Sequence, residues 1–297
     1  MSMTTDTVGI SRKSLAGARA QFQARKLTDH VATVFLSACA VLCVAVLLLI
    51  LGYVVYRGAG YINWQFLTAL PKPVGEAGGG VGNALVGSAV IVTIAVLMAV
   101  PLGVGAAIFL NEFPSGVLGR GIRFLADILT GVPSIVVGLV AYGLVVAPMR
   151  HFSAISGAVA YAFIMVPIVL ITAQEALRLV PSTLREASLA LGVPRWRTIM
   201  QVVIPVSSRA LLTGIILAIA RALGETAPML FTAFGNPYWN FDLTKPMATL
   251  PLVIYRYATG PYNDWHEQAW AASFVLVVVV LLSSILTRSV LRNKFDA

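Results

Sequence analysis

Six long apolar runs, separated by shorter polar segments, constrain the fold of this 297-residue chain more than any other feature. They cover approximately residues 31–55, 84–110, 124–147, 153–173, 210–234 and 269–287. A helix needs about 20 apolar residues to cross a hydrocarbon core about 30 Å thick, and each run is close to that length or longer. Because backbone groups in lipid must find hydrogen-bond partners within the same segment, we expect six transmembrane helices in an all-α bundle.

The composition supports a membrane protein and excludes several other classes. Apolar residues make up 58% of the chain and charged residues only 11%, whereas soluble domains have about 25% charged residues. Too few polar side chains are present to cover a water-soluble core, which excludes a soluble enzyme, a nucleic-acid-binding domain and a disordered chain. Cys39 and Cys43 lie within the first run, and we interpret them as small apolar side chains rather than a disulfide or metal site.

The distribution of basic residues predicts the orientation in the membrane. Of the 21 Lys and Arg residues, 15 lie in segments on the side of the two chain ends and 5 on the other side, while Arg221 lies inside a run. Cytoplasmic loops carry an excess of Lys and Arg. We therefore expect a multi-pass protein of the cell (inner) membrane with cytoplasmic tails over residues 1–30 and 288–297. We expect the first tail, as far as Lys26, to be poorly ordered and to contact anionic membrane lipid.

The cytoplasmic segment 174–209 is long and locally organised. Thr183 and Glu186 have the spacing of a capping box, in which each side chain accepts a hydrogen bond from the backbone of the other residue. Good helix formers follow, and Gly192 predicts a left-handed stop. We expect a short helix here and a second helix over about 195–203. Such helices are either an amphipathic segment on the membrane surface or a docking site for a cytoplasmic partner.

A spaced motif favours the docking interpretation. It consists of Glu186, Ala187 and Ser188, then Gly192, then Val202, Ile204 and Pro205. This pattern resembles the EAA motif of the permease subunits of ATP-binding-cassette importers, with Ser188, Val202 and Ile204 as conservative departures. The resemblance implies a coupling helix seated in a groove of an ATPase subunit, where the small side chains of Ala187, Ser188 and Gly192 allow close approach of the partner.

The same resemblance implies the fold and the division of labour between subunits. It implies the type I (MetI-like) permease fold, with a core over residues 84–287 and a peripheral helix over residues 31–55. The chain has no G-x-x-x-x-G-K-[ST] loop to cradle the phosphates of ATP. We therefore expect a transport subunit that is not an enzyme and binds no cofactor, while partner subunits use ATP and Mg²⁺.

Two opposite charges lie inside the fifth run. Arg221 and Glu225 are four residues apart, so in a helix they share a face and can pair. A lone Arg at the bilayer centre costs at least about 2.5–3.5 kcal/mol, so we expect it to face the bundle interior or a water-filled path. The pair is either structural or part of an anion route, because a guanidinium fork matches the oxygens of a tetrahedral oxyanion. In the second case Glu225 holds Arg221 in place or accepts a proton from the anion.

Three further features concern helix packing and continuity. In the fifth run Gly214, Ala218 and Ala222 form a stripe of small residues that allows close helix packing. Pro228 is expected to interrupt the same helix. In the third run Pro133 frees a backbone carbonyl next to Thr130 and Ser134, and such a break either lines a cavity or only sets a kink.

Two segments resemble the permeases of the phosphate-specific importer. They are Arg-Ala-Leu-Gly-Glu-Thr-Ala-Pro at 221–228 and Leu-Ala-Asp-Ile-Leu-Thr-Gly-Val-Pro-Ser-Ile-Val-Val-Gly at 125–138. The resemblance covers about residues 82–288 and is closer to the second of that system's two permeases than to the first. It implies that Arg221 and Glu225 are the charged pair implicated in phosphate passage. We place Thr226, Thr130 and Ser134 on the same pathway.

The resemblance also implies partners, and three alternatives are weighed against it. The partners are a second homologous permease, two ATP-binding subunits, a periplasmic or lipid-anchored phosphate-binding protein and membrane lipid, with no nucleic acid. The first alternative is an importer of sulfate, molybdate or phosphonate, since the guanidinium fork suits each anion. An ATP-independent transporter or channel leaves the EAA-like segment unexplained. An intramembrane enzyme is disfavoured because His266-Glu267 opens a zinc motif that ends on Trp270 instead of His.

Overall fold

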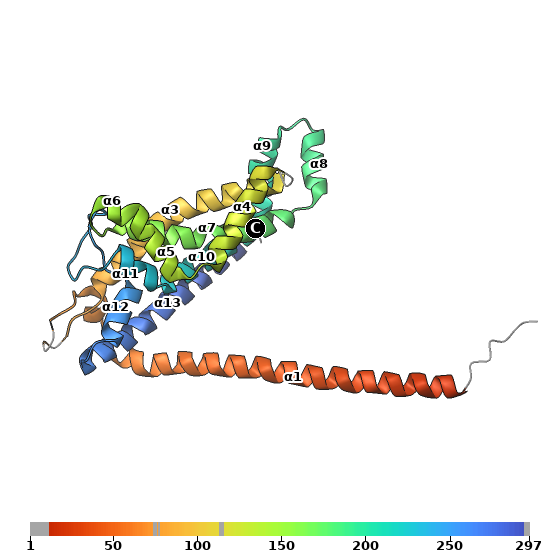
Figure 1. The fold of residues 1–297 in the computed structure, drawn as a ribbon, viewed down its shortest axis with the longest axis horizontal. Coiled ribbons are helices and arrows are strands. Elements are labelled where there is room, and N and C mark those ends of the chain that lie inside the picture. The colour runs from red at the N-terminus through yellow and green to blue at the C-terminus, as the bar shows by residue number, and fades with distance from the viewer. Residues whose placement is uncertain (1–11, 74–75, 77, 113–115, 294–297) are drawn as a thin grey trace, which may run out of the picture. The chain divides into compact units, whose positions relative to one another are not determined.

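The computed structural model describes residues 12–73, 76, 78–112 and 116–293 (Figure 1). The chain divides into two compact units, one ending at Val55 and the other beginning at Tyr56. Most of the first unit is helix α1 (Arg12–Gly58). The expectation of a poorly ordered N-terminal tail is therefore wrong for residues 12–26, where Ala, Gln, Lys and Arg favour a helix. Residues 1–11 lie outside the described part of the chain.

The second unit is built almost entirely of helices. In chain order they are a turn at Ala59–Tyr61, α2 (Trp64–Thr68), α3 (Gly82–Glu112), α4 (Val117–Gly131), α5 (Ser134–Ala141), a π-helical turn at Tyr142–Val146, α6 (Ala147–Met149), α7 (Ala154–Arg178), α8 (Ser182–Ala190), α9 (Arg195–Thr198), a second π-helical turn at Ile199–Val203, α10 (Ile204–Gly224), α11 (Ala227–Thr232), α12 (Leu250–Ala258) and α13 (Asn263–Asn293).

Five helical segments among the described residues are long and apolar enough to cross a membrane, and a bent pair brings the number to six if it counts as one span. The pair is Val117–Gly131 and Ser134–Met149, bent by 113°. The break expected at Pro133 is therefore present, and it bends the span sharply. Pro133 explains the break, because its ring disfavours helical backbone at the preceding residue, and Val132 is extended with φ −73° and ψ 131°.

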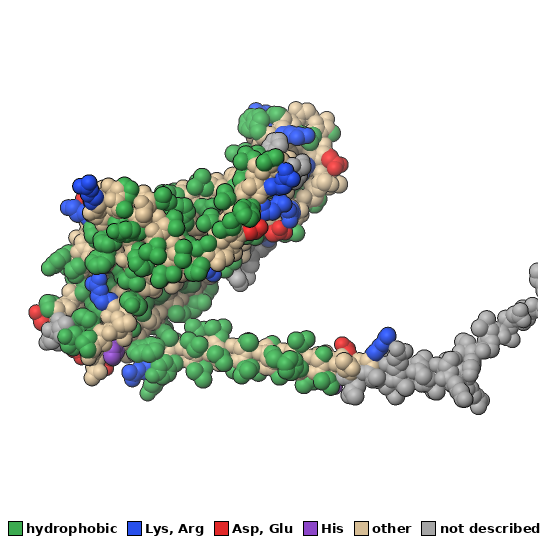
Figure 2. All heavy atoms as spheres, viewed as in Figure 1, with side chains coloured by type: hydrophobic (Ala, Val, Ile, Leu, Met, Phe, Trp, Pro, Cys, Tyr) green, Lys and Arg blue, Asp and Glu red, His purple; other side chains and the backbone are tan. Residues whose placement is uncertain are grey.

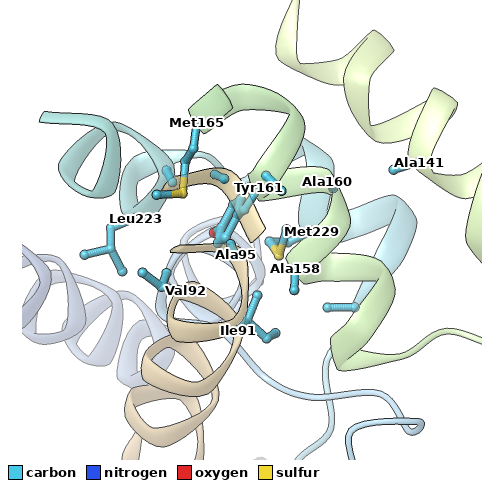
Figure 3. Packing of buried hydrophobic residues seen from close by; sticks show 14 of the residues in the cluster. Ile91, Val92, Ala95, Ala141, Ala158, Ala160, Tyr161, Met165, Leu223 and Met229 are labelled. Carbon is cyan, nitrogen blue, oxygen red and sulfur yellow. The ribbon is translucent and has the colours of Figure 1, made fainter. Parts of the chain in front are cut away.

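Helix α7 forms the centre of the second unit, with α3 and α10 packed along it. Its Tyr161 is almost fully buried in one apolar cluster with Ile91 of α3 (Figure 3). The predicted stripe of small residues on α10, namely Gly214, Ala218 and Ala222, is buried as expected. A Cβ atom at Gly214 would collide with Thr172 of α7. Close packing of α10 on α7 therefore depends on the missing side chain at that position.

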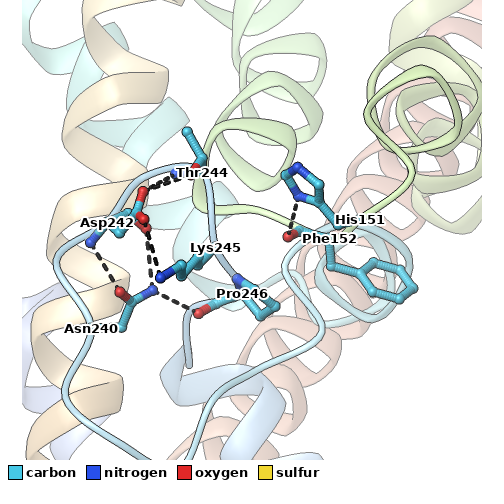
Figure 4. A network of polar contacts seen from close by, with 7 residues as sticks. All are labelled: His151, Phe152, Asn240, Asp242, Thr244, Lys245 and Pro246. Carbon is cyan, nitrogen blue, oxygen red and sulfur yellow. Dashed lines mark hydrogen bonds and ion pairs between the residues drawn. The ribbon is translucent and has the colours of Figure 1, made fainter.

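A loop after α11 covers the N-terminus of α7. The carbonyl oxygens of Leu243 and Lys245 accept hydrogen bonds of 3.1 and 3.0 Å from the first two backbone N–H groups of α7, which have no acceptor within the helix. Asp242 organises this loop by accepting hydrogen bonds from the backbone N–H of Thr244 at 3.0 Å and from its Oγ1 at 2.6 Å (Figure 4). These hydrogen bonds lower the pKa of the Asp242 carboxyl.

The surface of the second unit fits a membrane environment. On the face shown in Figure 2, hydrophobic side chains cover its middle, while Lys and Arg gather toward its two ends. Large exposed apolar residues include Leu97 and Leu102 of α3 and Leu217 of α10. An apolar surface of this extent needs lipid or a neighbouring transmembrane subunit to cover it.

Candidate functional site

The predicted fifth span is broken at Glu225. Helix α10 ends at Gly224, and Glu225 has extended backbone with φ −87° and ψ 115°. The chain becomes helical again in α11, where Pro228 lies in the first turn. The expectation that Pro228 interrupts a helix is therefore wrong in detail. Proline is tolerated in the first turn because the N–H it lacks would have no partner there, so Pro228 helps to begin a helix after the break.

Hydrogen bonds from α7 anchor both ends of α11. At the near end, the buried Tyr161 hydroxyl donates to the main-chain oxygen of Glu225 at 3.2 Å. At the far end, the oxygen of Thr232 accepts from the Ser156 hydroxyl at 2.9 Å and from the Ser153 N–H at 3.1 Å. Sequence reasoning missed Tyr161, for which the signal is a lone phenol in the most apolar part of the fourth run.

The helices that follow the two breaks pack against each other. A Cβ atom at Gly138 of α5 would lie 2.8 Å from the Cα atom of Pro228 in α11. Real Cβ atoms do not approach a backbone atom so closely, so the contact exists because position 138 has no side chain. The breaks after α4 and after α10 are therefore neighbours in space, although about ninety residues of chain separate them.

Both breaks border one small pocket of about 90 Å³. Its lining residues are Leu129, Thr130, Val132, Ser134, Val137, Ile164, Pro167, Ile168, Arg221 and Glu225. Four of the five residues placed on the pathway from the sequence are thus brought together from two spans, and α7 completes the pocket wall. The fifth, Thr226, is half-buried beside the break but does not line this pocket.

The charged pair is present but loosely joined. Nη2 of Arg221 and Oε1 of Glu225 are 3.7 Å apart, with side chains 58% and 20% exposed. This distance is longer than a hydrogen bond, so the guanidinium keeps donors for a further acceptor. Thr130 donates its hydroxyl to the Ala126 carbonyl at 2.8 Å, which leaves its oxygen as an acceptor toward the pocket. The pocket therefore combines one cation, one carboxylate and two hydroxyl groups.

The EAA-like segment forms two helices, of which only the first stands apart from the spans. Helix α8 begins after Pro181 and ends before Gly192, which has a left-handed φ of +78° as predicted. The predicted capping box is absent because Pro181 occupies the N-cap position, so Thr183 already lies inside the helix. The second helix predicted over about 195–203 is present as α9 and the π-helical turn that follows it, and it continues directly into α10.

Side chains link α8 to three spans. Arg185 pairs with Glu112 at the end of α3 and donates to the Leu177 carbonyl of α7 at 3.0 Å. The hydroxyl groups of Ser188 and Thr198 are 2.9 Å apart and connect α8 to the helix that becomes α10. Of the predicted coupling residues, Glu186, Ala187, Gly192 and Pro205 are exposed, and Ser188 and Ile204 are half-buried. Sequence reasoning missed the Arg185–Glu112 link.

A bundle of apolar helices with two broken spans around a charged pocket, and with a short exposed helix at one end, is the architecture of a membrane transport subunit. The family described as "Binding-protein-dependent transport system inner membrane component" matches residues 99–294. This match covers more than half of the chain. The chain belongs to that family of inner-membrane permease components.

Curated relatives match over most of their own length. A phosphate transport system permease protein PstA of Yersinia pestis is 43% identical over 249 residues, 84% of each chain. The PstA protein of Xylella fastidiosa strain 9a5c is 46% identical over 80% of this chain and 84% of its own. The PstA protein of Mycobacterium leprae is 38% identical over 86% of each chain.

Solved structures agree on the fold. An inward-facing structure of the MetNI methionine ABC transporter has a TM-score of 0.58 and 18% identity, and covers 72% of this chain and 94% of its own. A bacterial ABC transporter involved in the import of the acidic polysaccharide alginate has a TM-score of 0.56 and 14% identity, and covers 89% and 99%. The expected MetI-like permease fold is confirmed.

Proposed function

We propose that this chain is the permease subunit of an ATP-driven phosphate importer and forms part of the translocation pathway. The relatives described above, at 38–46% identity, carry the name of phosphate transport permeases. The observation that carries the proposal is the pocket in which Arg221 and Glu225 meet Thr130 and Ser134. A guanidinium with unused donors binds a tetrahedral oxyanion, and the nearby carboxylate limits how tightly it holds the anion.

Transport by this chain depends on a separate ATPase, since the sequence has no loop that cradles ATP phosphates. ATP and Mg²⁺ act in two ATP-binding subunits, and this chain binds no cofactor. A second homologous permease completes the membrane domain, and an extracytoplasmic phosphate-binding protein delivers the anion. The excess of Lys and Arg on the α8 side supports cytoplasmic chain ends and a cytoplasmic α8.

Coupling runs through α8. The ATPase displaces this helix, and the side-chain links at Arg185 and Ser188 carry the movement into α3, α7 and α10. Because α10 ends at the break that holds Glu225, a shift of α10 changes the geometry of the charged pocket. The chain needs no covalent chemistry on the anion: it alternates access to the pocket.

The direct test is uptake by the reconstituted complex of this chain with its partner subunits. ATP-dependent uptake of labelled phosphate is expected, with no uptake in the absence of ATP. Labelled sulfate, molybdate and phosphonate serve as competitors and distinguish a phosphate importer from an importer of another oxyanion. Uptake that continues without the ATPase would overturn the proposal in favour of a secondary transporter or channel.

A paired substitution at Gly192 tests the coupling role. No heavy atom lies within 4 Å of a Cβ at this position, but its φ of +78° disfavours most side chains. Asn tolerates this conformation better than Ala does. If the partner needs the space, Gly192→Asn uncouples ATP hydrolysis from uptake more than Gly192→Ala. If only the backbone matters, Gly192→Ala is the more harmful substitution and the docking role of Gly192 is refuted.

A further inference from the structure

A second pocket lies where the end of α1 meets α12 and α13, in the second unit and at the opposite end from α8 (Figure 1). Its volume is about 350 Å³. The lining residues are Arg57, Ile254, Ala258, His266, Ala269, Trp270 and Ser273. None of them belongs to the charged pocket or to the EAA-like segment, so the proposed function leaves this pocket without a role.

The pocket lies where two candidate spans end. The first span ends at Tyr61, shortly after Arg57, and the last begins at Asn263, one turn before the pocket residues of α13. The two ends are in close contact, since a Cβ atom at Gly58 would lie 2.6 Å from the main-chain oxygen of Trp270. Tyr56 and Trp64, near Arg57 in the chain, are 81% and 80% exposed. Aromatic side chains at span ends lie at the level of lipid headgroups.

The pocket carries one uncommitted positive charge among apolar walls. Within the described part of the chain, no ion pair or hydrogen bond engages the Arg57 guanidinium, and no Asp or Glu lines the pocket. The other polar groups are already used: His266 Nε2 bonds to the Gly260 carbonyl at 2.7 Å, and the Ser273 hydroxyl donates to the Ala269 carbonyl at 2.7 Å. A ligand must therefore offer an anionic group to Arg57 and apolar surface to the walls.

We propose that this pocket binds an anionic phospholipid, with its phosphodiester on Arg57 and its upper acyl chain along Ile254, Ala258 and Ala269. Basic pockets between transmembrane helices hold anionic headgroups on the cytoplasmic side of membranes, and a guanidinium at the other end of the spans offers a phosphodiester the same charge-assisted hydrogen bonds. Inorganic phosphate shares the anionic group but has no apolar part. A free anion with one cationic partner would lose more hydration than this pocket returns. The combination of one guanidinium with aliphatic walls therefore favours the lipid.

Native mass spectrometry of the assembled transporter in nanodiscs tests this assignment. The probe is phosphatidylglycerol titrated against phosphatidylcholine. Arg57→Gln is expected to lower phosphatidylglycerol retention about tenfold, the value of one charge-assisted contact. Arg150→Gln is the matched control, because Arg150 is also exposed after α6, at the same end of the unit, but does not line the pocket. Equal retention in the two variants would overturn the proposal.

A second variant separates lipid binding from assembly. Ala258→Trp fills the pocket but keeps Arg57, so it is expected to release phosphatidylglycerol as Arg57→Gln does. Because Ala258→Trp keeps the positive charge, it still tests lipid binding if the Arg57→Gln complex fails to assemble. Millimolar inorganic phosphate is expected to leave the lipid bound. Displacement of the lipid by phosphate would assign the pocket to free anions instead, and retention of the lipid in Ala258→Trp would place it elsewhere.

Discussion

Two helix breaks border the charged pocket, and the structure holds them in different ways. At the α10–α11 break, side chains of α7 hydrogen-bond to both ends of α11, through Tyr161 to Glu225 and through Ser156 to Thr232. At the α4–α5 break, the hydrogen bonds are local, from Val132 N–H to Ile128 at 3.1 Å and from Val136 N–H to Pro133 at 2.9 Å. Among described residues, no side chain of another helix hydrogen-bonds to residues 128–138.

The difference suggests a division of roles between the two walls of the pocket. The wall that carries Arg221 and Glu225 is fixed to the central helix, whereas the wall that carries Thr130 and Ser134 is held mainly by packing. Elements with few non-local hydrogen bonds open at lower free energy cost. We infer that the charged wall moves together with α7 and α10 as one body, while the α4–α5 wall shifts relative to it and so changes the geometry of the pocket.

The largest expected effect follows from removing the cation on the fixed wall. Arg221→Gln is expected to lower ATP-dependent phosphate uptake by at least about tenfold, because a charge-assisted contact to an anion contributes about 1.5–3 kcal/mol. Assembly of the complex should be unchanged, since the ion pair is 3.7 Å long and its Arg side chain 58% exposed.

Arg221→Lys is the matched control for this substitution. It keeps the positive charge and loses the planar fork, so partial uptake is expected if charge alone suffices and none if bidentate binding is required. Purification of the subunit complex measures assembly for both variants. Failure of assembly in Arg221→Gln would mean that the pair locks the bundle and that its role is structural.

The next largest effect is expected from disturbing the contact between α5 and α11, which joins the two walls of the pocket. Gly138→Ala is expected to destabilise the conformation in which α5 packs on Pro228. Overpacking costs about 1–3 kcal/mol of the free energy of unfolding. Gly131→Ala is the control, since a Cβ there meets no heavy atom within 4 Å. Thermal unfolding and uptake measured together distinguish the variants. Equal behaviour of the two would show that the walls do not depend on this contact.

Loss of one anchor on the fixed wall should have a smaller effect. Tyr161→Phe removes the hydrogen bond to the Glu225 carbonyl and is expected to cost about 0.5–1.5 kcal/mol of stability. If the fixed wall depends on this anchor, amide exchange after the break speeds up at Met229 and Leu230. If amide exchange at these two residues is unchanged in Tyr161→Phe, the packing of the ring, which this variant keeps, holds the break without the hydroxyl.

The sequence predicted the span positions, the MetI-like fold and four of the ten residues that line the charged pocket, but neither the size of the bend at Pro133 nor the break at Glu225. The spacing of apolar residues and the hydropathy of a run identify a span, but they do not reveal where its backbone leaves the helical conformation. The Glu225 side chain itself gives no sign that its backbone is extended. The capping box failed because Pro181, two residues before Thr183, occupies the N-cap position and starts the helix earlier. The lone phenol of Tyr161 marks the residue, but its role could not be predicted because its partner is a main-chain oxygen 64 residues away.

The smallest expected effect concerns the loop that caps α7, the helix to which the fixed wall is anchored. The pKa of Asp242 is lower in the folded chain, chiefly because Thr244 donates to it, so its contribution is present above the unfolded pKa of about 4 and is lost as pH falls through the folded value. Amide exchange at Ala154 and Ile155, whose N–H groups bond to this loop, is therefore expected to quicken relative to the intrinsic exchange rate below about pH 4. Asp242→Asn keeps an acceptor that does not titrate, so exchange at these two amides should lose that pH dependence. The same acid-induced increase in Asp242→Asn would assign the effect to another group and leave the anchoring of α7 independent of this loop.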